Sequence, residues 1–406
     1  MIDRRSMVRN AVALGMLPLG RGPDAGARLM QDVARYVAFG EHRSGTIPEA
    51  QTAGWIARRL SALGFKATIE TTPVSTLLRP SGELVCAGLK VEAFPQWRPP
   101  TTLLGKTLEG PLAPSGALKS GAFWVMGAPS PLSAYWPADS QAMAVSARQA
   151  GAKALLMAFA EPTDGIFACN QEAQGDLPLP VALLRPSDLL ALQGRTAQGA
   201  AARLTLLALP AEASAHSVLA RKLGSGAPIV ISTPLSGWFR CGAERGPGIA
   251  LMLHLAARLS TSVRPVWILA TGAHELGHRG MKQLLQTPGL PPPADVSLWL
   301  HLGAGLASRG LDAQYHTVSP QFATVSRAFE VRLKAIFPAA DWIWLPVRPG
   351  APGEGGDVAK AGYDRLVSLA GVFPGFHTQG DDGSAIDRAA LVRLAETLTG
   401  MVADLA

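Results

Sequence analysis

Hydrophobic positions near the start of the chain recur at helical spacing. The spacing predicts two helices with one buried face each, over 28–37 and over 48–63. Gly64 directly follows the second stretch, at the place where a glycine commonly ends a helix. Apolar and polar residues then alternate over 65–71, which predicts a strand with one buried face. The chain is therefore expected to begin with two helices and a strand.

The pattern changes from residue 214 onward, where short apolar runs alternate with helical stretches. Uninterrupted runs of this length are typical of strands that are covered on both faces, as in a parallel sheet. Helical stretches such as 248–259 and 280–286 fall between them. The alternation predicts an α/β fold with a mostly parallel sheet and helices on both faces. The strand candidates are 216–221, 228–232, 266–270, 296–302 and 366–371.

A segment of different character, 75–208, lies between these two parts of the chain. Its apolar runs are short and are divided by Pro and Gly, which predicts several strands with few helices. We expect a small β-rich unit that is inserted into an α/β domain formed by 27–74 and 209–406. The segment has no charged cluster with catalytic spacing, so we expect it to modulate access or binding. Its apolar runs are 122–126, 154–157 and 180–184, and one helix is expected over 140–150.

Composition narrows the class of protein. The 406 residues are 48% hydrophobic, which is enough for two packed units and too much for a disordered chain. The net charge of +7 includes no Lys/Arg block with interleaved aromatic residues, so we expect no nucleic-acid partner. No apolar run approaches the length of about 18 residues that a membrane span requires, so we expect no integral membrane span. The three cysteines permit at most one disulfide and match no Cys-based zinc site.

The first residues resemble a twin-arginine export signal. Arg4 and Arg5 precede a short, weakly apolar stretch over 11–19. We therefore expect residues 1–26 to be a signal segment and the protein to be exported, to the periplasm or the extracellular space. The alternative is an ordinary basic tail.

The run from His274 to His278 spells H-E-x-x-H. On a helix, the two histidines would share one face and bind zinc, and Glu275 would activate a water. However, the preceding residues 266–272 read as a buried strand that ends in a glycine, and Gly277 and Gly280 would weaken a helix. A strand-end loop is therefore the alternative interpretation of the run.

Several candidate site residues follow strand candidates directly. His274 and Glu275 come after 266–270, His301 lies at the end of 296–302, and His377 follows 366–371. In a mostly parallel sheet, binding sites form at the carboxyl ends of the strands. We therefore expect these side chains to lie near one edge of the sheet.

Four motifs follow one another along the chain. They are Arg43-Ser44-Gly45-Thr46, the strand-end run from Ala270 to Gly280, Leu300-His301-Leu302-Gly303, and Phe376-His377-Thr378 followed by Asp381. In this order and spacing, they resemble the motifs of the co-catalytic zinc aminopeptidases, whose relatives include bacterial aminopeptidases, glutamate carboxypeptidases and glutaminyl cyclases. The inserted unit resembles the protease-associated (PA) domain that many members carry at this place.

The resemblance implies a zinc site that has diverged. The family binds two zinc ions, but Thr233 stands where its first histidine ligand would be, and His274 replaces the general-base Glu. Glu275 and His377 keep their ligand positions, and Glu244 falls where the bridging Asp would be. These three residues predict one zinc ion rather than two, and no ion at all is the alternative.

Some of the remaining candidates have two interpretations. His301 replaces an Asp ligand and is either a metal ligand or catalytic contact or an ordinary buried histidine. His274 is expected to move the proton during catalysis, although it could equally be a ligand. Arg245, beside Glu244, would make an ion pair if Glu244 does not bind metal. Thr378 and Asp381 are expected to orient His377, and Asp357 to contribute to substrate binding.

Two functions of different classes follow. The first is an exported metallopeptidase-like hydrolase that acts on peptides or small amides, with zinc polarising the carbonyl group. The second is a non-catalytic protein that keeps the aminopeptidase fold to bind a peptide or another partner. The missing histidine at Thr233 and the missing general-base Glu motivate this second hypothesis. A helical H-E-x-x-H zinc protease is a further, less favoured hypothesis, because no third ligand follows His278 at the required spacing.

Overall fold

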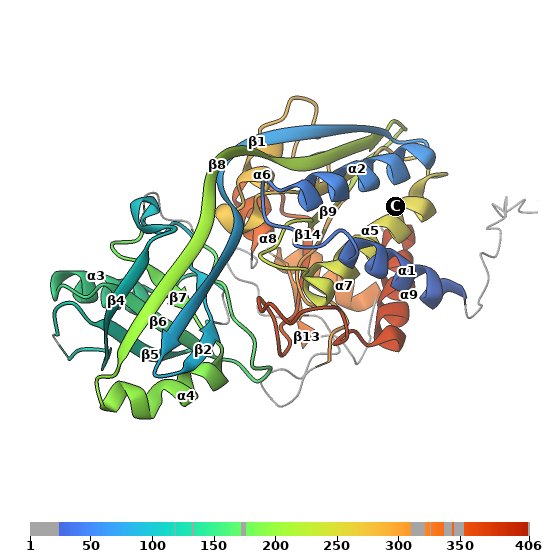
Figure 1. Ribbon diagram of the computed structural model, residues 1–406. Coiled ribbons are helices and arrows are strands. Elements are labelled where there is room, and N and C mark those ends of the chain that lie inside the picture. Colours follow the sequence, from blue (N-terminus) through green and yellow to red (C-terminus); the bar gives the residue numbers. More distant parts are fainter. Residues whose placement is uncertain are drawn as a thin grey trace, which may run out of the picture.

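The computed structural model describes residues 24–117, 119–131, 134–171, 176–309, 321–324, 326–336, 343–344 and 353–404. The expected export motif, with Arg4 and Arg5, lies outside these residues. The described chain forms two lobes that are joined by a long two-stranded ribbon (Figure 1). The larger lobe contains both ends of the described chain, and the smaller lobe is formed by the middle of the sequence.

The sheet of the larger lobe confirms the prediction of a mostly parallel α/β fold. Its strand order is β13-β12-β14-β11-β9-β10-β8, and β9 pairs in parallel with both β10 and β11, as β11 does with β14. Four of the five strand candidates coincide with one of these strands, with end points that differ by up to two residues, and the candidate 216–221 is the last part of the much longer β8. The strands are β8 (Ala201–Lys222), β9 (Ile229–Pro234), β10 (Val266–Thr271), β11 (Leu298–Leu302), β12 (Gln321–Ala323), β13 (Ile343–Trp344) and β14 (Leu366–Ala370).

Helices cover both faces of this sheet, also as predicted. Alternate residues of β9 point to opposite sides: Ile229 and Ile231 pack into one core with the first helices, whereas Val230 packs into another. This burial on both faces explains the uninterrupted apolar runs in the sequence. One face carries α1 (Asp24–Val37), α2 (Ile47–Ala62), α5 (Gly242–Leu259), α7 (Arg327–Ile336) and α9 (Arg388–Asp404), and the other carries α6 (Arg279–Leu284) and α8 (Glu354–Lys360).

Helix α5 begins six residues earlier than predicted from the sequence. The sequence favours a loop there, because Gly242, Gly246 and Pro247 are poor helix formers. In the structure, the Asp381 carboxylate accepts hydrogen bonds from the backbone N–H groups of Ala243 (2.7 Å) and Glu244 (2.9 Å). A cap from a distant loop therefore supports a start that local propensity disfavours.

The ribbon between the lobes consists of β1 (Lys66–Cys86) and β8, paired antiparallel along almost their whole length. The predicted strand over 65–71 is only the beginning of β1. Both predicted boundaries of the inserted unit, residues 75 and 209, fall inside the ribbon, where Leu78 pairs with Leu209 just before a shift in register. The ribbon thus carries the chain from the larger lobe into the smaller one without a loop.

The smaller lobe has its own short sheet. Strands β4 to β7 lie side by side in parallel, and β3 closes one edge. The three apolar runs of the sequence form β5, β6 and β7, and the expected helix is α3. The sequence analysis missed α4. The elements are β2 (Leu89–Glu92), β3 (Phe94–Pro95), the short 3-10 helix η1 (Thr101–Leu103), β4 (Thr107–Pro114), β5 (Phe123–Pro129), α3 (Ala138–Gln149), β6 (Ala154–Ala160), β7 (Val181–Leu183) and α4 (Pro186–Ala197).

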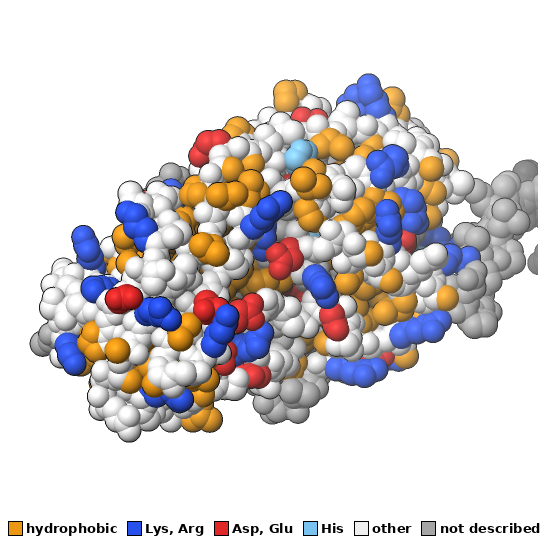
Figure 2. Space-filling view, viewed as in Figure 1, with side chains coloured by type: hydrophobic (Ala, Val, Ile, Leu, Met, Phe, Trp, Pro, Cys, Tyr) orange, Lys and Arg blue, Asp and Glu red, His pale blue; other side chains and the backbone are white. Residues whose placement is uncertain are grey.

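The surface and the cysteines add two observations. Lys and Arg side chains are dispersed over the visible face, with Asp and Glu between them (Figure 2). Among the described helices, none is long and apolar enough to cross a membrane. Cys86, Cys169 and Cys241 are all buried free thiols.

Candidate functional site

The H-E-x-x-H run is a tight turn and not a helix. Only His274–Leu276 form a short 3-10 helix, η2, directly after β10. The flanking residues Ala273, Gly277 and His278 all have left-handed backbone conformations, with φ of 54°, 73° and 57°. The strand-end loop is therefore confirmed, and the hypothesis of a helical zinc protease is wrong, because its ligand geometry requires a regular helix.

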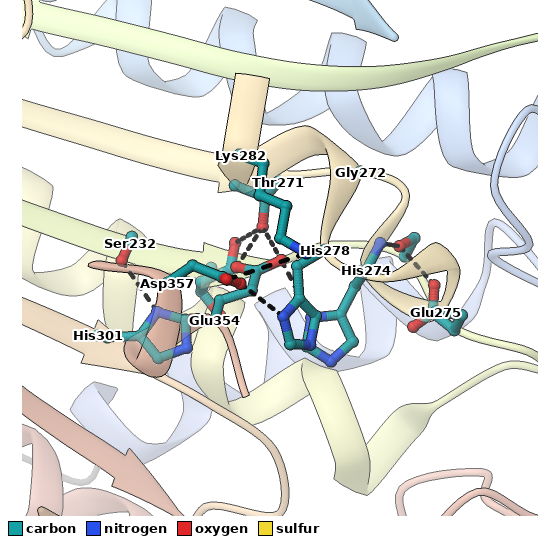
Figure 3. Close-up of polar contacts among 12 residues, drawn as sticks. Ser232, Thr271, Gly272, His274, Glu275, His278, Lys282, His301, Glu354 and Asp357 are labelled. Carbon is teal, nitrogen blue, oxygen red and sulfur yellow. Dashed lines mark hydrogen bonds and ion pairs between the residues drawn. The ribbon is translucent and has the colours of Figure 1, made fainter. Parts of the chain in front are cut away.

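The two histidines of the run are each bound to a different carboxylate of α8. His274 Nδ1 lies 3.0 Å from Glu354 Oε1, and His278 Nδ1 lies 2.7 Å from Asp357 Oδ2. Their rings lie beside one another, with centroids 4.7 Å apart (Figure 3). The two histidines thus belong to two separate, neighbouring histidine–carboxylate pairs, whereas the H-E-x-x-H motif would place both on one metal ion.

Arg245 occupies the centre of the predicted zinc-binding set. Its Nη2 lies 2.8 Å from Glu244 Oε1 and 3.2 Å from Glu275 Oε1, and its Nε donates to the Ser236 carbonyl oxygen. The side chain is fully buried. Although burial acts to lower the pKa of Arg245, the charges of Glu244 and Glu275 raise it, so the guanidinium remains a cation. Both carboxylates are therefore already ion-paired with the same protein side chain.

His377 and Glu244 do approach one another, as the predicted zinc-binding set requires. His377 Nε2 lies 3.3 Å from Glu244 Oε1, and both side chains are buried. Burial acts to raise the pKa of Glu244, but the charges of His377 and Arg245 lower it to about 2. For His377, burial acts to lower the pKa, and the Glu244 charge raises it. The pair is therefore an ion pair in the folded protein.

The partner that orients His377 differs from the sequence prediction. Thr378 donates its hydroxyl to the Gly375 carbonyl oxygen, and Asp381 caps α5 as described above. The His377 Nδ1–H group donates instead to the backbone oxygen of Ala168, at 2.9 Å. Thr378 and Asp381 thus stabilise the surrounding backbone, and a residue of the inserted segment orients the imidazole.

His301 has the surroundings of an ordinary buried histidine. Its Nδ1 lies 2.9 Å from Ser232 Oγ, which also accepts a hydrogen bond from the Trp299 indole N–H. Burial lowers the pKa of His301 to about 3, so the ring is neutral. Figure 3 shows His301 and Glu275 on opposite sides of the His274–His278 pair. This geometry favours the structural interpretation of His301 over that of a metal ligand or catalytic contact.

His274 is neutral and held in one tautomer. Burial, followed by the nearby positive charge of Arg245, lowers its pKa well below the usual value. A neutral ring donates Nδ1–H to Glu354 and leaves Nε2 as a proton acceptor. The Thr271 hydroxyl lies within 2.9 Å of both Glu354 oxygens, and burial raises the pKa of Glu354 to about 7. His274 therefore keeps the atom that a general base would need.

The sequence analysis missed the contribution of the inserted segment to this site. Its residues 167–171 run along both site loops: the Ala168 N–H donates to the His377 carbonyl, and the Gln171 N–H donates to the Glu275 carbonyl. The Tyr135 hydroxyl lies 2.6 Å from His278 Nε2. Glu354 was also missed, although it lies in the same Gly-rich stretch as Asp357. Nothing in the local sequence marks these residues, because their partners are more than 75 positions away.

The described residues do not fit the zinc site that the resemblance implies. Among them, no group of three or more His, Cys, Asp or Glu side chains is arranged to hold a metal ion. A zinc ion would lie about 2 Å from the same carboxylate oxygens that Arg245 contacts. Two cations would then share one buried site at close range, which is strongly unfavourable at low dielectric. Glu244 and Glu275 therefore act as partners of Arg245 in this structure.

Several solved structures with the same architecture are peptidases. A zinc aminopeptidase from Bacillus subtilis superposes with a TM-score of 0.72 at 17% identity, covering 93% of this chain and 94% of that one. A peptidase M28 precursor from Shewanella amazonensis SB2B superposes with a TM-score of 0.69 at 15% identity, covering 94% of this chain and 96% of that one. The protein has the zinc aminopeptidase fold.

A third solved structure has the same fold. An aminopeptidase from Aneurinibacillus sp. strain AM-1 gives a TM-score of 0.65 at 15% identity, with 94% of each chain covered. No family model and no curated protein matches the chain. The fold predicted from the motifs is thus confirmed by three-dimensional similarity, at sequence identities that carry the fold alone.

Proposed function

We propose that this protein binds peptides or small amides at the strand-end site and does not hydrolyse them through zinc. The observation that carries the proposal is the position of Arg245, between the two carboxylates that were expected to hold the ion. The peptide part rests on the fold, because three of the solved structures that share it are peptidases. The diverged residues His274 and Thr233 are consistent with a site that has kept its shape and lost its metal chemistry.

A zinc-dependent hydrolase is the second candidate, and His377 favours it. Metal-ligating histidines usually donate their second ring N–H to a carbonyl or carboxylate, which fixes the ring. His377 has this arrangement, with Nδ1–H on Ala168 and Nε2 toward Glu244. For one zinc ion to be held by Glu244, Glu275 and His377, the Arg245 side chain would have to leave its present position. His274 would then remain the candidate for proton transfer.

The export signal and the PA-like unit belong to the same proposal. Arg4 and Arg5 support export by the twin-arginine route, which carries folded proteins, to the periplasm or beyond the cell. The segment 75–208 would act as a PA-like unit that shapes access, since its residues 167–171 border the site.

Metal analysis tests the zinc part of the proposal. The protein is purified without chelator, offered zinc, and assayed for bound metal and for cleavage of aminoacyl-nitroanilides. We expect no stoichiometric zinc and no cleavage for the wild type. We expect Arg245→Ala to gain about one zinc per chain, because it frees Glu244 and Glu275, whereas Arg245→Lys keeps a cation and gains none.

Peptide binding is measured separately by calorimetry with short peptides. We expect binding that weakens about tenfold in Asp357→Asn, which alters the site, and is unchanged in Arg148→Ala, an exposed control on α3. Wild-type protein that retains about one zinc and releases nitroaniline would establish the hydrolase instead. Absence of both cleavage and peptide binding would contradict the proposal.

A further inference from the structure

A hydrogen-bonded chain of three side chains joins the inserted unit to the strand-end site. The Tyr135 hydroxyl lies 2.6 Å from His278 Nε2, and His278 Nδ1 lies 2.7 Å from Asp357 Oδ2. Tyr135 comes from the smaller lobe, His278 from the loop after β10, and Asp357 from α8. His278 is the second histidine of the H-E-x-x-H run, and neither zinc binding nor the Arg245 ion pairs give it a role.

The order of atoms in this chain is that of a hydroxyl nucleophile, a base and an orienting carboxylate. Asp357 accepts the Nδ1–H of the imidazole, so the Nε2 lone pair faces the Tyr135 O–H and accepts its proton. The same sequence of contacts activates hydroxyl nucleophiles on unrelated folds. Here the arrangement needs no metal ion.

The surroundings hold the base and its partner in place. His278 has φ of 57°, and its backbone N–H donates to the His274 carbonyl. Lys282 Nζ lies 3.9 Å from the other Asp357 oxygen, and the His278 and Asp357 side chains are 8% and 11% exposed. His274 has its own carboxylate, Glu354, and does not compete for Asp357. Tyr135 is more exposed than His278, which is buried, so the nucleophile lies at the less buried end of the three.

We propose that Tyr135 is a metal-independent nucleophile toward aryl esters and similarly activated acyl compounds, with His278 as its base and Asp357 as a positioning residue. Tyr135 Oη forms a bond to the acyl carbon while its proton passes to His278 Nε2. The ester C–O bond then breaks, and the leaving oxygen takes the proton from His278. Water, deprotonated by His278, hydrolyses the acyl-tyrosine, and the proton returns to Oη. No oxidant or cofactor is consumed.

The substrate class follows from leaving-group chemistry. A tyrosine hydroxyl has a pKa of about 10 in water, so a tyrosinate departs from a tetrahedral intermediate far more readily than an amide nitrogen does. Attack on a peptide bond would therefore revert, whereas attack on an ester whose leaving group has a similar or lower pKa proceeds forward. This activity is distinct from the peptide binding proposed above and does not depend on it.

The test uses two probes, 4-nitrophenyl acetate and an arylsulfonyl fluoride, on the full chain. We expect a burst of about one nitrophenolate per chain, acetyl on Tyr135 by mass spectrometry, and sulfonylation of Tyr135 in preference to the other tyrosines. Tyr135→Phe keeps the ring and should abolish the burst. His278→Ala should slow the labelling about a hundredfold or more, and added imidazole should restore part of the rate. Asp357→Asn should slow it to a lesser extent.

A matched control is His254→Ala, which removes a half-buried histidine of α5 that is hydrogen-bonded to Thr399 of α9 and should leave the burst unchanged. Circular dichroism establishes that each variant is folded. If His278→Ala does not fold, the comparison of wild type with Tyr135→Phe decides the question by itself. An undiminished burst in Tyr135→Phe, or label found on other residues and not on Tyr135, would overturn the proposal.

Discussion

At the scale of single residues, buried pairings set the charge of the site. Arg245 forms ion pairs with both Glu244 and Glu275. His377 forms a second ion pair with Glu244, and His274 stays neutral beside Glu354. Removing one member of such a buried pair leaves an uncompensated charge, which is far more costly than losing an exposed ion pair. The site therefore depends on its set of pairings as a whole.

Glu354 gives the protein a predictable dependence on pH. Burial raises its pKa from 4.5 to about 7, so the folded state keeps a proton that the unfolded state has already released. The corresponding stability is fully present below about pH 4.5 and is lost as the pH rises through about 7. A rise of this size corresponds to about 3 kcal/mol.

We therefore expect Glu354→Gln to lose less stability than the wild type between pH 4.5 and pH 8, by about 3 kcal/mol. Urea unfolding at both pH values measures the difference. Glu109→Gln, which removes an exposed carboxylate on β4, is the control and should follow the wild type. An equal change in the free energy of unfolding between the two pH values for wild type and Glu354→Gln would show that Glu354 has an ordinary pKa.

At the scale of elements, the close packing of backbone segments shapes the turn after β10. A Cβ at Gly280 would collide with the Gly272 carbonyl oxygen and would lie 2.7 Å from Ser217 Oγ. The first turn of α6 thus lies directly against the end of β10, and the His274–Leu276 turn fits between them. Gly280, one of the two glycines that weaken a helical interpretation of the run, is the one that permits this packing.

We expect Gly280→Ala to destabilise the protein by about 1–3 kcal/mol, as overpacking of a well-filled core does. Chemical unfolding provides the measurement. Gly194→Ala is the matched control: Gly194 lies inside helix α4, and a Cβ there meets nothing within 4 Å. That substitution should stabilise by about 0.5–1 kcal/mol, because alanine favours a helix interior over glycine. Similar effects at the two positions would contradict this explanation.

At the scale of the whole molecule, the two lobes share a hydrophobic core. Trp238 and Phe239 of the larger lobe pack into the core of the smaller one. There, the ring centroids of Trp238 and Trp97 are 5.2 Å apart. The Trp238 indole N–H also donates to Asn170 of the inserted segment. Because of this contact and the continuous β1–β8 ribbon, we expect the two lobes to unfold as one cooperative unit.

We expect Trp238→Ala to cost about 3–5 kcal/mol, as removal of a buried tryptophan does, and both lobes to unfold in one transition. Far-UV circular dichroism and hydrogen exchange of β5 to β7 should report the same midpoint. Trp136→Ala removes a half-buried tryptophan of the smaller lobe and should cost less. Separate transitions for the two lobes in the wild type would contradict a shared core.

The sequence by itself determined the buried strands of the larger lobe. β9, β10, β11 and β14 are buried on both faces, so their local hydrophobic runs are sufficient to locate them. The turn after β10 was also predictable, because its glycines act locally. The order of motifs along the chain was enough to predict the fold, since that order reflects the topology.

Only the tertiary structure decided which side chains meet. Asp381 caps a helix 137 positions away in the sequence. Ala168 orients His377, which is 209 positions away, and Tyr135 contacts His278, which is 143 positions away. Arg245 stands next to Glu244 in the sequence, yet its contact with Glu275 depends on how α5 packs against the end of β10. Hydrophobic periodicity is a local property and can be read from the chain. The position of a buried charge is fixed by partners from several distant segments, and it appears only when the chain is folded.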